Sequence, residues 1–249
     1  MADTTTNIRT SVTAIIFLSR QWYLEDISDS YKKLDTSNID MRLTIIVDDI
    51  NIKKDDIEYY FEECNPKIFY TENEQIPEGN IPARRSRIAE IFNFARKYPT
   101  DTEYILTIED DTIMPSDGLQ KLLKLDNDGL RSGVQMGRHA IKMLGLWHIK
   151  PGQYQTLPYS TGIEKIDACG LYFCLIPKPI WDNTPFIYDA DSPVGPDVLY
   201  GESLHEYTHL ADMSVQCGHN IIRGILWPNE SCQQITFTKQ PEYWEPVIQ

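Results

Sequence analysis

Short runs of apolar and β-branched residues alternate with helix-like segments through the first half of this chain of 249 residues. Between the last two runs, apolar residues recur with helical spacing and predict a helix over 83–97. Alternating units of this length predict an α/β fold in which a mostly parallel sheet carries helices on its faces, and such sheets bind ligands at the carboxyl ends of their strands. The four runs have the uninterrupted hydrophobicity of buried strands: TAIIFL (13–18), LTIIV (43–47), KIFY (67–70) and YILTI (104–108).

The second half of the chain is broken into shorter pieces by glycine and proline, and we expect a mixed α+β arrangement there. One helix is predicted from Ser203 to Cys217, with Gly218 as its C-terminal cap. Residues 233–249 are expected to form a polar and aromatic tail. No linker is long enough to separate two domains, so we expect one domain. Strand-like stretches lie near 133–137, 171–176 and 220–227.

The chain carries 37 acidic and 23 basic residues, a formal net charge of -14. This charge argues against broad electrostatic binding to nucleic acid or anionic membranes, although a specific nucleic-acid substrate stays open. The five cysteines are scattered without a CxxC pair, which indicates a reducing compartment and no zinc ribbon. The apolar run over 14–18 is too short for a signal sequence or a membrane span. We therefore expect a cytoplasmic protein without membrane insertion.

Two acidic clusters follow predicted strands directly. Asp48 and Asp49 come after LTIIV, and Glu109, Asp110 and Asp111 come after YILTI. In an extended segment the first and third side chains point to the same side, so Glu109 and Asp111 can converge on a hard divalent cation such as Mg²⁺ or Mn²⁺. A solvated acidic turn is the alternative for either cluster alone. Their matched positions at strand ends favour a site.

Three arginines crowd the first turn of the predicted helix, at positions 84, 85 and 87. Cations are unfavourable there because the helix dipole places partial positive charge at this end. A phosphate or pyrophosphate group would offset this, since it can bind both the free N–H groups and the guanidinium groups. Pairing with surface carboxylates is the alternative. Three arginines in four positions favour an anion site.

These segments, together with IDACGLYFCLIPKPIW further along, resemble the GT-A fold of nucleotide-sugar-dependent glycosyltransferases, particularly the small family-2-like members. The resemblance covers roughly 13–232 and implies a GT-A-like single domain with a Rossmann-like, mostly parallel sheet and helices on both faces. It implies a nucleotide-binding half over about 13–111 and a mixed α+β acceptor and catalytic half over about 112–232. The implied activity is transfer of a sugar from a nucleotide-sugar donor, a UDP-sugar by expectation, to a hydroxyl acceptor. That acceptor is a glycan, a protein, a lipid-linked carrier or a hydroxylated DNA base.

The resemblance also implies roles for the residues of the first half. Asp48 or Asp49 would bind the base or ribose, and Arg84 or Arg87 would contact the nucleotide, with Asp110 grouped among the nucleotide-binding residues. Glu109 and Asp111 would take the place of a DxD motif that holds Mn²⁺ or Mg²⁺ against the diphosphate.

Further roles fall in the second half of the chain. Asp167, Cys169 and Gly170 would lie beside the donor sugar and the acceptor, and Asp212 would be the catalytic base. Trp147 is a candidate for an acceptor surface through stacking, although packing is the simpler role for an aromatic in such a loop.

Two departures from the family pattern matter. The motif reads EDD rather than DxD, which leaves open whether Glu109 binds the metal directly or through water. Many relatives supply a late histidine as a further metal ligand, whereas the corresponding stretch here, WPNESCQQ, has none. Either Cys232 or Gln233 then stands near the metal, or the protein supplies no third ligand.

A competing motif is His205-Glu206-Tyr207-Thr208-His209, a literal HExxH. On a helix it would place two histidines on one face as zinc ligands, with Glu206 as the base of a metallopeptidase and Glu230 as the candidate third ligand. A peptidase leaves both acidic clusters and the arginines unexplained, so the transferase is favoured. A nucleotide-sugar-binding protein without catalysis is the third alternative. The helical spacing of His205, His209 and Asp212 is the reason for choosing Asp212 as base.

Overall fold

The main sheet has its strands in the order β3-β2-β1-β4-β11-β6-β12-β13. The computed structural model describes residues 9–71, 80–137, 141–221, 224–240 and 243–248. The first half of the main sheet is entirely parallel, because β1 pairs in parallel with β2 and β4, and β2 pairs in parallel with β3. The four apolar runs all form the predicted strands: β1 (Thr10–Leu18), β2 (Ile39–Val47), β3 (Lys67–Tyr70) and β4 (Tyr104–Glu109). The prediction that KIFY is buried is wrong, because β3 is the edge strand of the sheet and none of its residues is fully buried.

The second half of this sheet mixes directions, as the α+β prediction requires. Strand β11 is antiparallel to both β4 and β6, whereas β6 and β12 run parallel. Two short strands, β5 and β9, pair with β12 beside the main path. The bounds are β5 (Thr112–Ile113), β6 (Arg131–Gln135), β9 (Ile163–Ile166), β11 (Phe173–Pro177), β12 (His209–Ile221) and β13 (Gly224–Leu226).

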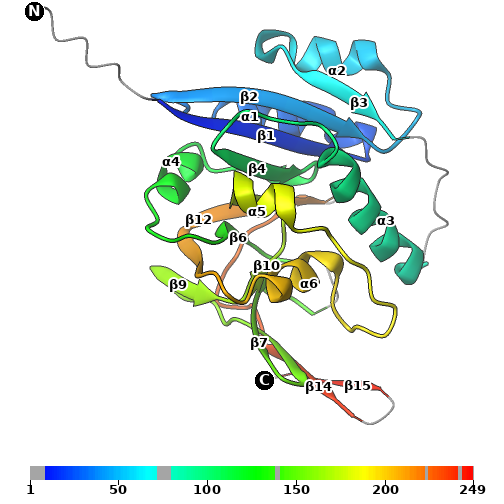
Figure 1. The fold of residues 1–249 in the computed structure, drawn as a ribbon, viewed down its shortest axis with the longest axis vertical. Coiled ribbons are helices and arrows are strands. Elements are labelled where there is room, and N and C mark those ends of the chain that lie inside the picture. Colours follow the sequence, from blue (N-terminus) through cyan, green and yellow to red (C-terminus); the bar gives the residue numbers. More distant parts are fainter. Residues whose placement is uncertain (1–8, 72–79, 138–140, 222–223, 241–242, 249) are drawn as a thin grey trace, which may run out of the picture.

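Helices cover both faces of the main sheet, as predicted (Figure 1). One core packs α3, α5 and α6 through Phe92, Trp181 and Tyr200. The other packs α1, α2 and α4 through residues that include Ile27 and Ile57. The bounds are α1 (Leu24–Lys32), α2 (Lys54–Tyr60), α3 (Ile81–Ala95), α4 (Gly118–Leu123), α5 (Lys178–Asn183) and α6 (Pro196–Ser203), with single 3₁₀ turns η1 (Gln21–Tyr23) and η2 (Glu62–Cys64).

The helix predicted over 83–97 is confirmed as α3, shifted by two residues at each end. Asn80 is its N-cap, and the Asn80 side chain accepts a hydrogen bond from the backbone N–H of Ala83. Pro82 lies in the first turn, where its missing N–H costs nothing. The cap and the proline therefore fix the start of the arginine-rich turn at the end of the sheet.

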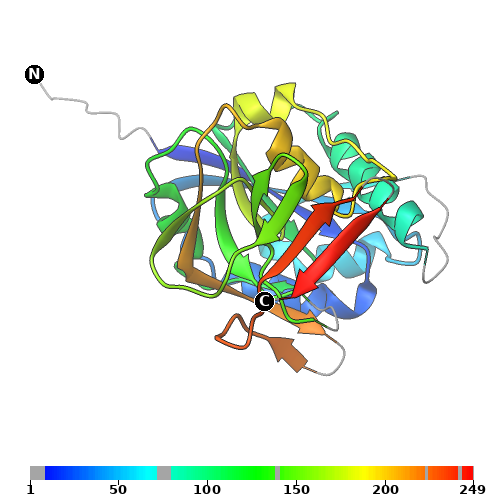
Figure 2. The same cartoon turned by 90° about the horizontal axis from the view of Figure 1, so that it is seen from below.

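A second, smaller sheet is built from late segments of the chain, in the order β10-β7-β8-β14-β15. The segment expected to be a polar and aromatic tail over 233–249 is instead part of a sheet, because β14 and β15 pair in antiparallel fashion and extend it (Figure 2). No helix in the described part of the chain is long and apolar enough to cross a membrane. The bounds are β7 (Leu146–Lys150), β8 (Gln153–Thr156), β10 (Ala168–Cys169), β14 (Ile235–Lys239) and β15 (Trp244–Ile248).

The helix predicted from Ser203 to Cys217 is also wrong. Helix α6 ends at Ser203, and strand β12 begins at His209. Along β12, buried residues alternate with more exposed ones from His209 to Cys217, which is the period of a strand with one face in the core. Gly218 is no helix cap: it lies within β12, where an added Cβ would come within 2.5 Å of Ile225 on β13.

Candidate functional site

Carboxylates gather where strand β4 ends, at the carboxyl edge of the parallel half of the sheet. Glu109 is the last residue of β4, and Asp110 and Asp111 form the turn into β5. The Asp110 carboxylate accepts hydrogen bonds from the backbone N–H of Ser19 at 2.7 Å and from its hydroxyl at 3.1 Å. Since Ser19 directly follows β1, Asp110 ties the ends of two neighbouring strands together. Asp110 therefore holds the turn in position, and its expected nucleotide-binding role stays a prediction.

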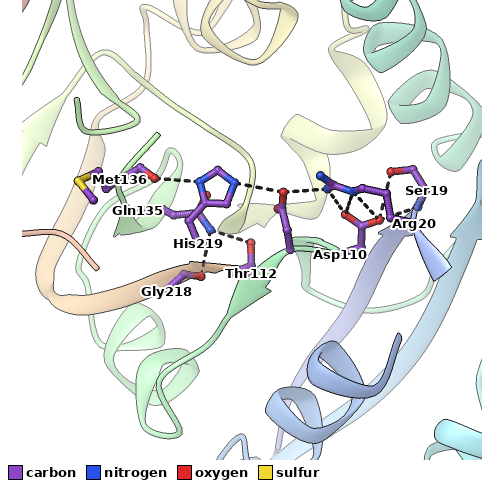
Figure 3. A network of polar contacts seen from close by, with 9 residues as sticks. Ser19, Arg20, Asp110, Thr112, Gln135, Met136, Gly218 and His219 are labelled. Atoms are coloured by element: carbon purple, nitrogen blue, oxygen red, sulfur yellow. Dashed lines mark hydrogen bonds and ion pairs between the residues drawn. The ribbon is translucent and has the colours of Figure 1, made fainter. Parts of the chain in front are cut away.

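Asp111 is almost fully buried and is held from two sides. Its Oδ2 atom lies 2.8 Å from a guanidinium nitrogen of Arg20 and 3.1 Å from Nε2 of His219. The other ring nitrogen, Nδ1 of His219, lies 2.9 Å from the carbonyl oxygen of Met136. Figure 3 shows the imidazole of His219 with one edge toward Met136 and the other toward the Arg20–Asp110 pair.

The contact of His219 with Asp111 has a chemical consequence. Because a carbonyl oxygen only accepts, Nδ1 must carry the proton that it donates to Met136. In the neutral ring the Nε2 lone pair then faces a carboxylate oxygen at 3.1 Å. Two lone pairs at this distance repel, so a proton between the two atoms or a cation near both is required. The pair is therefore built to hold positive charge.

Glu109 belongs to the same acidic group. Burial, followed by the charges of Asp111 and Asp197, raises the pKa of Glu109 to about 7. Asp197 stands in the first turn of α6, and its own pKa is raised by burial. A Cβ added at Gly170 would lie 3.7 Å from an Asp197 carboxylate oxygen, which places that carboxylate against the glycine predicted to lie near the donor sugar. Three carboxylates from β4, its following turn and α6 thus share one region.

The carboxylate oxygens here suit Mg²⁺ or Mn²⁺, which prefer oxygen ligands. Two ligands at right angles around a cation with bonds of about 2.1 Å lie about 3.0 Å apart. The 3.1 Å between Oδ2 of Asp111 and Nε2 of His219 is close to this spacing and is also an ordinary hydrogen-bond distance. Within the described residues, no three His, Cys, Asp or Glu side chains already converge as a complete metal cage. The guanidinium of Arg20 stands beside the Asp111 oxygen instead.

His219 is the residue that sequence reasoning missed. The stretch WPNESCQQ holds no histidine, but His219 lies on strand β12, which precedes that stretch, and it contacts Asp111. Cys232 lies in the apolar core, and the backbone N–H of Gln233 donates to the carbonyl of Lys142. The alternation along β12 was the available signal, and the helical interpretation of the same residues hid it.

The two nucleotide-binding candidates Arg87 and Asp48 bind each other. The Arg87 guanidinium is buried and donates to both oxygens of Asp48, through Nε at 3.1 Å to Oδ2 and through a close Nη2 contact to Oδ1. It also donates to the Thr71 hydroxyl at 3.0 Å. Arg87 therefore orients Asp48 rather than presenting a free guanidinium to a ligand. Asp49 closes a turn by accepting from the backbone and side-chain N–H groups of Asn51.

The other two arginines of α3 divide their roles. Arg85 donates to the carbonyl oxygens of Ser192 at 2.9 Å and Pro193 at 2.7 Å, so it fastens the loop that leads into α6. Arg84 is exposed in the first turn of the helix. Of the three arginines expected around one anion, Arg84 is therefore the one that is exposed to solvent.

The residues expected beside the donor sugar and the acceptor lie in different environments. Gly170 lies against Asp197, as described above. Trp147 is only 6% exposed and packs in an apolar cluster near Phe237, so the stacking surface expected of it is absent. Cys169 is fully buried with its sulfur 3.7 Å from that of Cys174. Asp167 accepts a hydrogen bond from the backbone N–H of Ile149 at 2.8 Å.

Asp212 does not share a helical face with His205 and His209, because no helix forms there. Asp212 is on strand β12, opposite Ile163 of β9, and its carboxylate accepts from the backbone N–H of Ser214. It precedes His219 by seven residues in the chain, and the pairing of β12 with β6 shifts register between Ala211 and Gln216. Asp197 is the carboxylate that the fold brings to the acidic group instead.

The HExxH motif does not form a zinc site. Its residues lie in the turn after α6 and at the start of β12, so the two histidines do not share a helical face. His205 is exposed, whereas His209 is 2% exposed and its Nδ1 accepts the backbone N–H of Leu130 at 3.0 Å. Burial lowers the pKa of His209, which keeps the ring neutral with its proton on Nε2. Neither nitrogen of His209 then offers a lone pair to zinc.

No protein-family profile and no curated protein sequence matches this chain. Among solved structures, the mannosyltransferase PcManGT from Pyrobaculum calidifontis in complex with GDP-Man and Mn²⁺ is 13% identical, with a TM-score of 0.55 over 84% of this chain and 56% of its own. S. aureus TarS 1-349 in complex with UDP-GlcNAc is 12% identical, with a TM-score of 0.51 over 82% of this chain and 59% of its own. The chain thus spans a little over half of each of these structures.

These likenesses establish the fold. The chain has a GT-A-like glycosyltransferase fold, as the resemblance of its sequence motifs implies. Protein A197 from STIV is 13% identical over 96% of this chain and 94% of its own, with a TM-score of 0.47.

Proposed function

We propose that this chain is a metal-dependent glycosyltransferase that moves a sugar from a nucleotide-sugar donor, a UDP-sugar by expectation, to a hydroxyl acceptor. One observation carries the proposal: Glu109, Asp111 and Asp197 share, with His219, the carboxyl edge of a GT-A-like sheet. Open α/β sheets place their ligand sites at this edge. Two structural neighbours, with GDP-Man and Mn²⁺ in one and UDP-GlcNAc in the other, support the class of donor.

Asp111 and His219 would hold the Mn²⁺ or Mg²⁺ ion, with Glu109 beside them. When bound, the cation supplies electrostatic stabilisation of the charge that develops on the departing nucleoside diphosphate. A divalent charge at Asp111 would also favour the ionised form of Glu109, whose pKa is raised mainly by burial and by neighbouring carboxylates.

The nucleotide would lie between the ends of β2 and α3. Asp48, held in place by Arg87, and Asp49 are the candidates for contact with the base or ribose. Arg84 is the candidate for contact with the diphosphate, because it is exposed at the N-terminus of α3, where free N–H groups also favour anions.

Asp197 would take the acceptor hydroxyl proton as the sugar is transferred with inversion. Its raised pKa makes it a stronger base than an ordinary aspartate. Because residue 170 is a glycine, no side chain of that residue covers the Asp197 carboxylate. An α6 position also fixes this carboxylate on a regular element rather than on a loop, and regular elements hold catalytic groups more rigidly.

The first experiment measures thermal stabilisation by UDP, GDP, dTDP and CMP, each with and without Mn²⁺, since a ligand that binds the native state raises its apparent stability. We expect one nucleoside diphosphate to stabilise the protein in the presence of Mn²⁺. Asp111→Asn should abolish the metal-dependent part, and the exposed carboxylate change Asp101→Asn should leave it intact. Unchanged metal-dependent stabilisation of Asp111→Asn would remove this carboxylate from the site.

The second experiment separates a transferase from a protein that only binds nucleotide sugars. The corresponding nucleotide sugar is incubated with the protein and Mn²⁺, and release of the nucleoside diphosphate is followed with glycan, peptide or hydroxymethylated DNA as acceptor. Release that depends on the acceptor identifies a transferase and its acceptor class. Tight donor binding without release in any arm would favour the non-catalytic alternative.

A further inference from the structure

Arg20 is a cation that the fold already places on the two aspartates. It follows β1, and its Nε lies 3.1 and 3.3 Å from the two oxygens of Asp110, with a closer contact between its Nη2 and Oδ1. The same Nη2 nitrogen lies 2.8 Å from Oδ2 of Asp111. The side chain is 18% exposed and stacks over the ring of Tyr23, with 4.8 Å between Cζ and the ring centroid.

This contact uses the oxygen that pairs with His219. Oδ2 of Asp111 is the atom nearest both the guanidinium and Nε2 of His219. A divalent cation bound to that oxygen would lie within a few ångströms of the guanidinium. Like charges so close, at a carboxylate that is almost fully buried, repel strongly because little water screens them. The guanidinium and a metal ion therefore exclude each other at Oδ2.

We propose that Arg20 is a built-in competitor of the divalent cation: it neutralises Asp111 in the absence of ligand and must release that carboxylate before the cation binds. The inference rests on the proposed function in one respect, namely that a divalent cation binds at Asp111. It adds that the resident arginine weakens this binding and makes it depend on the donor.

The geometry of Arg20 suits such a release. Its Nε contacts are with Asp110 alone, so the side chain can give up Asp111 and keep its anchor. Asp110 is also held by Ser19, so the turn keeps its shape when the arginine moves. A diphosphate that arrives with the cation offers the released guanidinium a new anionic partner. Metal and nucleoside diphosphate would then strengthen each other's binding through Arg20 as well as through direct contact.

The test compares Mn²⁺ binding by the wild-type protein and by Arg20→Gln, using calorimetry or the electron paramagnetic resonance signal of free Mn²⁺. Gln can still donate to Asp110 but carries no charge. We expect Arg20→Gln to bind Mn²⁺ alone at least tenfold more tightly, and the gain in Mn²⁺ affinity caused by saturating UDP to be smaller than in the wild type. Arg42→Gln is the matched control, because Arg42 is exposed and pairs with Asp40 and Asp101 at the other end of the sheet.

Arg20→Lys keeps the inference testable should the Gln variant fail to fold. A lysine is a point charge that cannot span both carboxylates as the guanidinium does, so it should stay on Asp110 and leave Asp111. We expect at least threefold tighter Mn²⁺ binding for this variant. Equal or weaker Mn²⁺ binding by the folded Arg20 variants, with Mn²⁺ and UDP bound by the wild type, would overturn the competitor role alone. Failure of all variants and the wild type to bind Mn²⁺ or any nucleotide would overturn the proposed function with it.

Discussion

Replacing Arg87 by methionine should destabilise the fold, in contrast to the same change at Arg84. Arg87 is 8% exposed, and its loss would leave Asp48 without the guanidinium that contacts both of its oxygens. The hydrogen bond to Thr71 would be lost as well. Removing one partner of a buried ion pair costs about 3–5 kcal/mol because the other charge stays buried and unpaired. Because Asp48 still accepts a hydrogen bond from the Thr71 hydroxyl and is partly exposed, we expect the free energy of unfolding to fall by about 3 kcal/mol.

The assay is urea unfolding followed by circular dichroism, for Arg87→Met, Asp48→Asn and the double variant. The double variant should be more stable than the sum of the two single losses predicts, because it removes both charges of the pair. Arg84→Met is the matched control three positions away on the same helix. It should change the free energy of unfolding by no more than about 0.5 kcal/mol, the usual effect of an exposed substitution.

The same variants separate structure from binding. Arg84→Met should weaken binding of the nucleoside diphosphate by at least about 1.5 kcal/mol, the scale of a hydrogen bond to a charged group. A loss of stability below about 1 kcal/mol for Arg87→Met, or strict additivity in the double variant, would refute the view that Arg87 is a structural partner of Asp48. Full nucleotide affinity in Arg84→Met would remove Arg84 from the diphosphate site.

Two other consequences of the structure can be measured. Asp197→Asn should lower the rate of sugar transfer by roughly 10²-fold or more with donor binding retained, as expected for loss of a general base. The Asp212→Asn variant should catalyse transfer at the wild-type rate. The reverse pattern would show that Asp212 is the base. The pKa of Glu109 is raised to about 7 in the fold, so the folded protein binds a proton that the unfolded chain has already released above its ordinary pKa. The metal-free wild type should therefore lose stability, on the order of 1–3 kcal/mol, as the pH rises from 5 to 8, and Glu109→Gln should show a smaller loss in urea unfolding at the two pH values. An identical loss in both proteins would contradict this origin.

The parallel half of the fold was predictable because its signals are local. Buried parallel strands read as unbroken apolar runs, and YILTI, TAIIFL and LTIIV are too short and too rich in β-branched residues to be helices. The strand ends then predict where Glu109 and Asp111 lie. The start of α3 was predictable for the same reason, since Pro82 and the helical spacing after it are features of one segment.

The segment from Ser203 to Ile221 was not predictable in the same way. Leu204, Tyr207, Ala211 and Val215 have helical spacing, while residues from His209 onward also alternate as a strand with one buried face. Local pattern alone does not choose between the two. Strand pairing decides for the strand, because β12 completes hydrogen bonds with β6, β9 and β13 that a helix at this place would leave unmade.

The sequence by itself therefore determined the four parallel strands of the first half, their order along the chain and the acidic residues at their ends. Only the tertiary structure decided which partners those residues meet. His219 reaches Asp111 from 108 residues away, Arg20 reaches it from the end of β1, and Asp197 comes from α6. The physical reason is that contacts between distant residues depend on strand register and on which face each element buries. Those are set by the packing of the whole core, and no single segment contains them.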